Sequence, residues 1–214
     1  MASDEPLARR AEGTQQKHRL LLLRHGETEW SRSGKHTSRT ELDLTDEGRK
    51  QAESAGETLT QLRLDNPYVV CSPRKRALIT AELAGLTVDE VTPLITEWDY
   101  GDYEGTTTDE IRKAVPDWLV WTHGCPGGET VAEVGERADA AIEMALNHMP
   151  SRDVLFVGHG HFSRAVLTRW IEQPMYEGIR FAMVAATIAA CGFEHNVRQI
   201  SRLGITGYPR PLYR

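Results

Sequence analysis

The stretch LLLLRHGETEW, Leu20–Trp30, begins with four consecutive leucines and then changes abruptly to polar residues. An uninterrupted apolar run of this length is typical of a strand buried on both faces, as in a parallel sheet, although periodicity alone does not separate it from a helix. Arg24 and His25 would then follow the carboxyl end of that strand. Because ligands of open α/β sheets bind at the carboxyl ends of strands, we expect a site as well as a strand here.

Downstream of this stretch, expected helices and strands alternate. Apolar residues three and four positions apart predict helices, the third of which starts at a capping box formed by Thr130 and Glu133. The expected helices are 45–62, 76–84, 131–149 and 162–171, and the expected strands are 20–23, 68–71, 88–92, 154–157, 188–193 and 197–203, of which the last two should pair. The alternation predicts an α/β fold: a single-domain, three-layer sandwich with a mostly parallel sheet and helices on both faces.

Composition limits the class of protein. The 214 residues are 40% apolar and 26% charged, which excludes a disordered acidic tail and a collagen-like chain. The 25 Lys and Arg against 31 Asp and Glu give a net charge of −6, which argues against a nucleic acid as partner. We expect one domain over 18–214, with the polar residues 1–17 as a mobile extension outside it.

Neither a secretion signal nor a membrane span is expected. Residues 1–17 lack an apolar core, and the longest apolar run, Phe181–Cys191, is shorter than the ~20 residues that cross a bilayer. The three cysteines are odd in number, widely spaced and without a C-x-x-C pair, which argues against a disulfide framework. We therefore expect a cytoplasmic protein with no membrane partner.

Three polar clusters each follow an expected strand: Arg24-His25, Ser72–Arg76 and Gly158-His159. Strand ends of a parallel sheet meet at one edge, so the topology predicts that the clusters converge on one pocket. A neutral imidazole is a competent nucleophile, and the planar guanidinium of arginine binds phosphate through two parallel hydrogen bonds.

A phosphate cradle would form around His25. Its candidate donors are Arg24, Arg76 and His159, which would stabilise phosphoryl transfer without a metal ion or other cofactor. Glu97, after the strand expected at 88–92, is a candidate acid for the leaving group. Taken alone, each residue has an ordinary explanation as a surface charge, a solvated helix residue or a buried histidine whose ring nitrogens have hydrogen-bond partners. Only their joint occurrence favours catalysis.

Five segments occur in a fixed order along the chain. They are RHGETEW (Arg24–Trp30), CSPRKRALITA (Cys71–Ala81), ITEWDYGDYEG (Ile95–Gly105), PGGET (Pro126–Thr130) and VGHGH (Val157–His161). Together they resemble the motifs of the histidine phosphatase superfamily, in its phosphoglycerate mutase-like branch. The resemblance extends from about Arg19 to at least Arg169, and the residues of the motifs are most similar to those of acid phosphatases and sedoheptulose bisphosphatases.

This resemblance implies a metal-independent phosphatase that hydrolyses phosphate monoesters of small molecules, as acid phosphatases do. His25 matches the histidine that becomes phosphorylated, and Glu97 matches the acid that protonates the departing alcohol and then activates water. The groups that hold the phosphoryl oxygens correspond to Arg24, Arg76 and His159. Many relatives form dimers, so a homodimer is one expected assembly, although no segment identifies an interface.

Substrate-side positions of the family correspond to Thr37, Ser38 and Tyr100. Gly26 and Gly160 are expected to let the backbone approach the phosphate closely. Ser31 stands where many relatives have Asn, and its hydroxyl would still bind a phosphate oxygen while leaving more room. His161 stands where many have Asn or a small residue, and it would either contact a second anionic group or cap the following helix.

Two related activities stay open: a phosphoglycerate mutase, and a sugar bisphosphatase of narrow specificity. At the general acid, mutases have a pattern similar to Glu-Arg-His-Tyr-Gly, whereas this chain has EWDYG at Glu97–Gly101. Mutases also carry further arginines in a lid segment, whereas residues 114–124 of this chain hold no arginine pair. A mutase must retain a doubly phosphorylated intermediate, so fewer cations argue against it. Two more distant functions are a metal hydrolase, suggested by His25-x-Glu27 and His159-x-His161, and an inactive binding module, which the intact catalytic set argues against.

The surroundings of the pocket stay open. Trp118 and Trp121 either line it or pack in the core. Asp99, Asp102 and Glu104 would discourage a second charged group of the substrate if they face inward.

Overall fold

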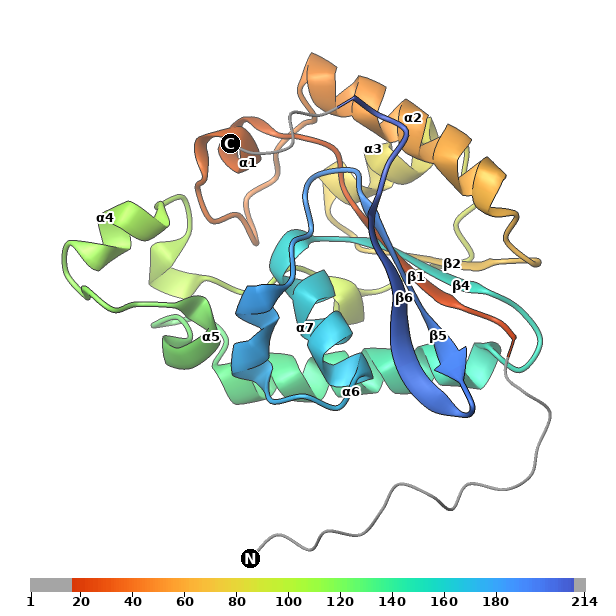
Figure 1. Cartoon of the computed structure of the whole chain (residues 1–214). Helices are drawn as coiled ribbons and strands as arrows, with labels where there is room; N and C mark the ends of the chain where they lie inside the picture. The colour runs from red at the N-terminus through yellow and green to blue at the C-terminus, as the bar shows by residue number, and fades with distance from the viewer. Residues whose placement is uncertain (1–16, 210–214) are drawn as a thin grey trace, which may run out of the picture.

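A six-stranded sheet forms the centre of the protein, which is described here over residues 17–209 of a computed structural model (Figure 1). The strands are β1 (Leu20–Arg24), β2 (Tyr68–Cys71), β3 (Glu90–Val91), β4 (Val154–Gly158), β5 (Ile188–Glu194) and β6 (Val197–Ile205). Their order in the sheet is β3-β2-β4-β1-β5-β6. The β3-β2, β2-β4 and β4-β1 pairs are parallel, and β5 joins β1 and β6 in antiparallel pairs. The expectation of a mostly parallel sheet is confirmed.

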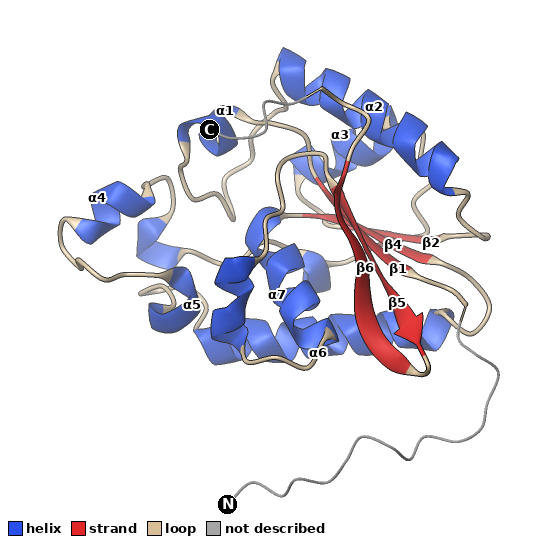
Figure 2. Ribbon diagram, viewed as in Figure 1, coloured by secondary structure: helices blue, strands red, loops and turns tan. Residues whose placement is uncertain are grey.

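Helices cover both faces of this sheet (Figure 2). The α-helices are α1 (Glu29–Ser33), α2 (Asp46–Leu62), α3 (Lys75–Leu83), α4 (Thr108–Arg112), α5 (Val120–His123), α6 (Val131–His148) and α7 (Gly160–Trp170), and the 3-10 helices are η1 (Pro93–Ile95), η2 (Gly101–Tyr103) and η3 (Met175–Arg180). Helices α2 and α3 pack on one face, and α6 and α7 pack on the other. The three-layer sandwich is therefore confirmed.

The leucines of β1 explain why both faces are covered. Leu20 and Leu22 belong to the core shared with α6 and α7, whereas Leu21 and Leu23 belong to the core shared with α2 and α3. Alternate side chains of a strand point to opposite faces, and all four are at most 1% exposed. The run is thus a strand buried on both sides, as its composition indicated.

Two of the differences between the expected and the observed elements have a clear physical cause. The strand expected over 88–92 shortens to the two residues of β3, because it forms an edge of the sheet where Val91 is exposed. Helix α7 begins at Gly160 rather than at Phe162, because Glu97 accepts the backbone N–H groups of its first turn. The capping box of Thr130 and Glu133 is present at the start of α6.

The three cysteines are free and buried. Within residues 17–209, no helix combines the length and the apolar character that crossing a bilayer requires. The expected N-terminal extension falls almost entirely on residues 1–16, which lie outside the described part of the chain.

Candidate active site

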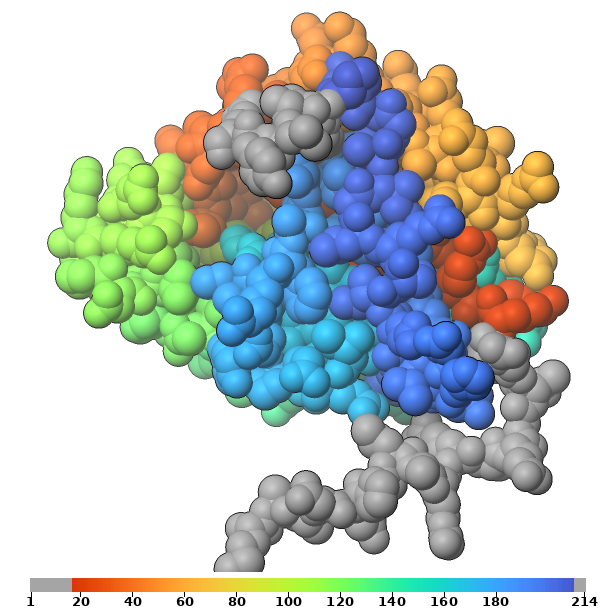
Figure 3. All heavy atoms as spheres, in the orientation of Figure 1, coloured from red at the N-terminus to blue at the C-terminus, as the bar shows by residue number. Residues whose placement is uncertain are grey.

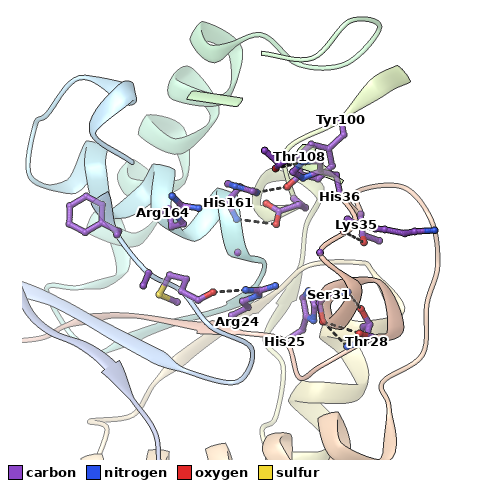
Figure 4. Close-up of a pocket in the computed structure, with 17 residues that line it drawn as sticks. Arg24, His25, Thr28, Ser31, Lys35, His36, Tyr100, Thr108, His161 and Arg164 are labelled. Carbon is purple, nitrogen blue, oxygen red and sulfur yellow. Dashed lines mark hydrogen bonds between the residues drawn. The ribbon is translucent and has the colours of Figure 1, made fainter. Parts of the chain in front are cut away.

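A pocket of about 430 Å³ opens at the carboxyl ends of β1 and β4. Its walls come from five segments: the stretch from the end of β1 to Thr37, the turn around Glu97 and Tyr100, Thr108 at the start of α4, the first two turns of α7, and residues 181–183. In Figure 3 the surface is hollowed between the segment that carries α4 and α5 and the segment that follows α7. Figure 4 shows Arg24 and His25 on one side of this pocket and His36, Tyr100 and His161 on the other.

His25 is held in one tautomer. Its Nδ1 lies 2.7 Å from the carbonyl oxygen of Gly26, and because a carbonyl only accepts, Nδ1 must carry the proton. Burial, then the charges of Arg76 and Arg24, lower the pKa of His25 well below its usual value. The ring is therefore neutral at neutral pH, and Nε2 holds an unshared electron pair.

Arg24 lies beside His25 at the end of β1. Its Nη1 donates to the carbonyl oxygen of Met183 over 2.6 Å, which fixes the guanidinium against the segment 181–183. A Cβ at position 160 would lie 3.1 Å from the guanidinium carbon, so Gly160 leaves space for the arginine. A Cβ on Gly26 would overlap the backbone of Gly48. Gly26 therefore permits close packing of this loop against α2, which differs from the expected approach to phosphate.

Arg76 and His159 lie beneath the pocket and are fully buried. The guanidinium of Arg76 donates to the carbonyl oxygens of Thr40, Thr37 and Ser38 at 3.1–3.2 Å. The rings of His159 and His25 meet edge to face, with centroids 5.3 Å apart. The predicted convergence of the three strand ends is thus realised, with Arg24 and His25 lining the pocket and the other two behind them.

Glu97 is buried where helix α7 begins. Its Oε1 accepts the backbone N–H groups of Trp98 and Phe162 at 3.0 and 2.7 Å, and its Oε2 accepts that of His161 at 3.0 Å. The N–H groups of His161 and Phe162 are among those that the first turn of a helix leaves without intrahelical partners. An oxygen with two lone pairs has one left after a single hydrogen bond, so Oε2 is the oxygen with capacity for a proton.

Most expected substrate-side residues line the pocket: Ser31, Thr37, Tyr100, Gly160 and His161. Ser38 does not line it, because its hydroxyl donates to Glu104 over 2.6 Å and its carbonyl accepts from Arg76. The hydroxyl of Ser31 is used in the capping box of α1 with Thr28. The side chain of His161 neither caps the helix nor stands free: its Nδ1 lies 2.6 Å from the hydroxyl of Tyr100.

Several residues that line the pocket were not expected from the sequence: Thr28, Gly34, Lys35, His36, Thr108, Arg164 and 181–183. Arg164 carried a usable signal, because it lies one helical turn after Gly160 and therefore on the same face of α7. Its Nε donates to the carbonyl oxygen of Gly178 over 3.0 Å, and its guanidinium lies over the ring of Trp121. Burial lowers its pKa to about 10, so it stays charged at neutral pH. The side chain of Lys35, by contrast, points away from the pocket (Figure 4).

The two open points of the sequence are resolved. Trp118 and Trp121 are 2% and 3% exposed and belong to the hydrophobic core. None of the three acidic residues lines the pocket: Asp99 pairs with Arg39, and Glu104 accepts from the loop 38–40. The acidic residues therefore give no reason to exclude a second charged group on a substrate.

Two of the residues that suggested metal ligands, Glu27 and His161, have other contacts. Glu27 accepts from Thr45 over 3.0 Å, and His161 pairs with Tyr100. Over residues 17–209, no three His, Cys, Asp or Glu side chains are grouped as a metal site needs.

Comparison with known proteins identifies the relatives of this chain. The family model described as the histidine phosphatase superfamily, branch 1, matches residues 20–206. An acid phosphatase of Mycobacterium tuberculosis is 66% identical over 195 residues, which cover 91% of this chain and 96% of that protein. Sedoheptulose 1,7-bisphosphatase of Saccharomyces cerevisiae is 35% identical over 71% of this chain and 67% of its own length. The solved structure of an open reading frame product of Mycobacterium tuberculosis superposes with a TM-score of 0.89 at 66% identity, over 90% of this chain and all of that one.

Proposed function

Because the chain belongs to the histidine phosphatase superfamily, we propose that it is a phosphoric monoester hydrolase that works through a phosphohistidine on His25 without a metal ion. The observation that carries the proposal is the fixed tautomer of His25. Its Nδ1–H donates to Gly26, and the lone pair on Nε2 belongs to a ring that lines the pocket beside Arg24. A neutral imidazole with a free ring nitrogen is what attack on phosphorus requires.

In the first step, Nε2 of His25 attacks phosphorus, and the bond from phosphorus to the ester oxygen breaks. The departing alkoxide takes a proton from Oε2 of Glu97. Positive charge near the equatorial oxygens comes from Arg24 and Arg76, and His159 adds an N–H donor. In the second step, water attacks the phosphohistidine while Glu97 accepts its proton, which releases inorganic phosphate and restores the free imidazole.

The pocket supports a small-molecule phosphoester as substrate. Its volume of about 430 Å³ lies in the range of small-ligand sites. The 66% identity to an acid phosphatase favours a similar, acid-phosphatase-like activity in this chain. We also propose a cytoplasmic location, because the three cysteines are free, as is usual in a reducing compartment. A homodimer is a further proposal, which sedimentation would test.

A second candidate function is a sugar bisphosphatase. Arg164 is the observation that favours it, because a charged guanidinium lines the same pocket away from His25 and would bind a second phosphate group. A relative with 35% identity carries the name sedoheptulose 1,7-bisphosphatase. A phosphoglycerate mutase stays a weaker alternative, because residues 114–124 hold no arginine pair.

The test is release of inorganic phosphate in excess EDTA, with His25→Ala as the blank. The panel contains p-nitrophenyl phosphate, 3-phosphoglycerate, sugar monophosphates and sugar bisphosphates. Release by the wild type alone, together with acid-labile phosphate on the protein after rapid quenching, supports the proposal. Wild-type rates in His25→Ala would overturn it, and isomerisation of phosphoglycerate without release would support the mutase.

A further inference from the structure

Ser72 is a buried hydroxyl that the proposed mechanism does not use. It follows β2 directly, is fully buried, and places its Oγ 2.8 Å from Nε2 of His159. The backbone N–H of Ser72 donates to Val157 over 3.0 Å, and Cys71 and Val157 are register partners of adjacent parallel strands. Parallel pairing of β2 and β4 therefore brings Ser72 and His159 to the same edge of the sheet.

The surroundings of Ser72 allow its hydroxyl to be the donor in this hydrogen bond. Ser72 Oγ accepts a long hydrogen bond from the backbone N–H of Arg74 at 3.4 Å, which leaves its own O–H free to donate. Burial, and then the charge of Arg76, lower the pKa of His159 well below its usual value. The ring is therefore neutral and carries a single N–H. If Ser72 donates to Nε2, the proton of that ring must be on Nδ1.

The other ring nitrogen points to the same arrangement. Nδ1 of His159 is buried and has no hydrogen-bond partner among the described residues. The ring lies against that of His25, where the phosphoryl group is proposed to bind. A lone pair on Nδ1 would repel the oxygens of a bound anion, whereas Nδ1–H would donate to one of them.

We propose that Ser72 is a positioning residue, whose hydroxyl donates to Nε2 of His159 and holds the ring as the Nδ1–H tautomer. The N–H of His159 is then available to a phosphoryl oxygen. The inference rests on the proposed function for the identity of the anion, but the tautomer is a property of the free protein. Ser72 acts through His159 and does not itself contact the substrate.

The test combines nitrogen NMR with kinetics. In protein labelled with ¹⁵N-histidine, the His159 signals are assigned by their loss in His159→Asn. The wild type should show a protonated-type shift at Nδ1 and an unprotonated-type shift at Nε2. Ser72→Ala should show a mixture of tautomers, weaker competitive inhibition by inorganic phosphate, and a kcat/KM for p-nitrophenyl phosphate lowered about tenfold or more.

Ser163→Ala is the matched control. Ser163 is also a buried serine near His159, but it meets His159 only through its backbone N–H, at 3.3 Å, which the substitution keeps. Its tautomer spectrum and kinetics should equal those of the wild type. An Nε2–H tautomer in the wild type overturns the proposal, as does a Ser72→Ala protein that matches Ser163→Ala in all readouts.

Two further outcomes separate this inference from other failures. If Ser72→Ala does not fold, the wild-type spectrum alone decides the tautomer, and Ser72→Cys, with a weaker donor of similar size, should give an intermediate effect. If the wild type releases no phosphate from any ester, the proposed function fails, whereas the spectrum still tests the pairing of Ser72 with His159.

Discussion

The backbone N–H of Phe162 donates to Oε1 of Glu97 over 2.7 Å, so the proposed catalytic acid also caps helix α7. The N-cap residue of this helix, His159, makes no side-chain cap of its own. Glu97 therefore supplies from a distant segment the acceptor that a Ser, Thr or Asp usually supplies locally. Proton transfer and the start of the helix that carries Arg164 depend on one side chain.

Glu97→Gln should affect both properties. The kcat/KM for alkyl phosphates, which reports formation of the phosphohistidine, should fall about 10²–10⁴-fold, the usual contribution of a general acid, while that for p-nitrophenyl phosphate should fall much less because its leaving group needs no proton. The free energy of unfolding should fall by about 1–3 kcal/mol, because a Gln side chain has one accepting oxygen. Parallel kinetics on both esters and chemical denaturation measure these effects.

Glu133→Gln is the control for the helix cap. Glu133 accepts the backbone N–H of Thr130 over 2.8 Å at the start of α6, remote from the pocket lining. It should lower stability and leave both activities unchanged. Equal losses on the two esters in Glu97→Gln would remove Glu97 from the role of acid.

The fold was largely predictable because its signals are local. The four leucines of β1 show burial on two faces, and the Thr130 capping box marks the start of α6 without any tertiary information. The convergence of Arg24, Arg76 and His159 also followed, since each comes after a strand whose neighbours a parallel sheet restricts.

The far wall of the pocket could not be predicted in the same way. His36 lies in a loop, and 181–183 lie between η3 and β5, so neither has a periodic pattern. Their positions depend on long-range contacts, such as the hydrogen bond from Arg24 to Met183, which the sequence does not display. Ser38 shows the reverse: its correspondence to a substrate-side position of the family suggested a contact with substrate, but Glu104, 66 residues away, accepts from its hydroxyl.

Gly160→Ala should lower activity without lowering stability. The new Cβ would lie 3.1 Å from the guanidinium carbon of Arg24, which must then move away from its phosphate-facing position. Since Ala favours a helix over Gly, α7 itself should not be destabilised. We expect kcat/KM to fall about tenfold, as misplacement of a binding group predicts.

Gly192→Ala provides the matched comparison for that change, because a Cβ there meets nothing within 4 Å. Steady-state kinetics and thermal melting should show wild-type behaviour. A Gly160→Ala enzyme with unchanged kcat/KM would mean that Arg24 tolerates displacement.

His36 should make stability depend on pH. Burial lowers its pKa from 6.5 to about 4 in the folded protein, so between these values the unfolded chain binds more protons. This stabilising contribution is complete above pH 6.5 and is lost as the pH falls to about 4, where the loss amounts to about 3 kcal/mol. His36→Phe, which keeps the contact with Tyr100, should remove this part of the acid destabilisation.

The measurement is urea denaturation at pH 7 and pH 4. The difference in unfolding free energy between the two pH values should be about 3 kcal/mol smaller in His36→Phe than in the wild type. His195→Asn is the control, because His195 is exposed in a turn and has a positive φ that Asn tolerates. This substitution should leave the difference between the two pH values unchanged. Identical pH dependence in His36→Phe and the wild type would contradict the prediction.

Arg164→Gln should separate monophosphates from bisphosphates. The Arg164 guanidinium is held by the carbonyl of Gly178 and by the ring of Trp121, 4.7 Å from the centroid, so its charge has a fixed position in the pocket. A hydrogen bond to a charged group contributes about 1.5–3 kcal/mol. If the second phosphate binds there, KM for a sugar bisphosphate should rise about tenfold to a hundredfold, with little change for p-nitrophenyl phosphate. Arg169→Gln is the control, because Arg169 lies on the same helix but pairs with Asp139 at the surface, and this change should alter neither KM. Equal KM increases for both esters in Arg164→Gln would instead place Arg164 in the site of the transferred phosphate.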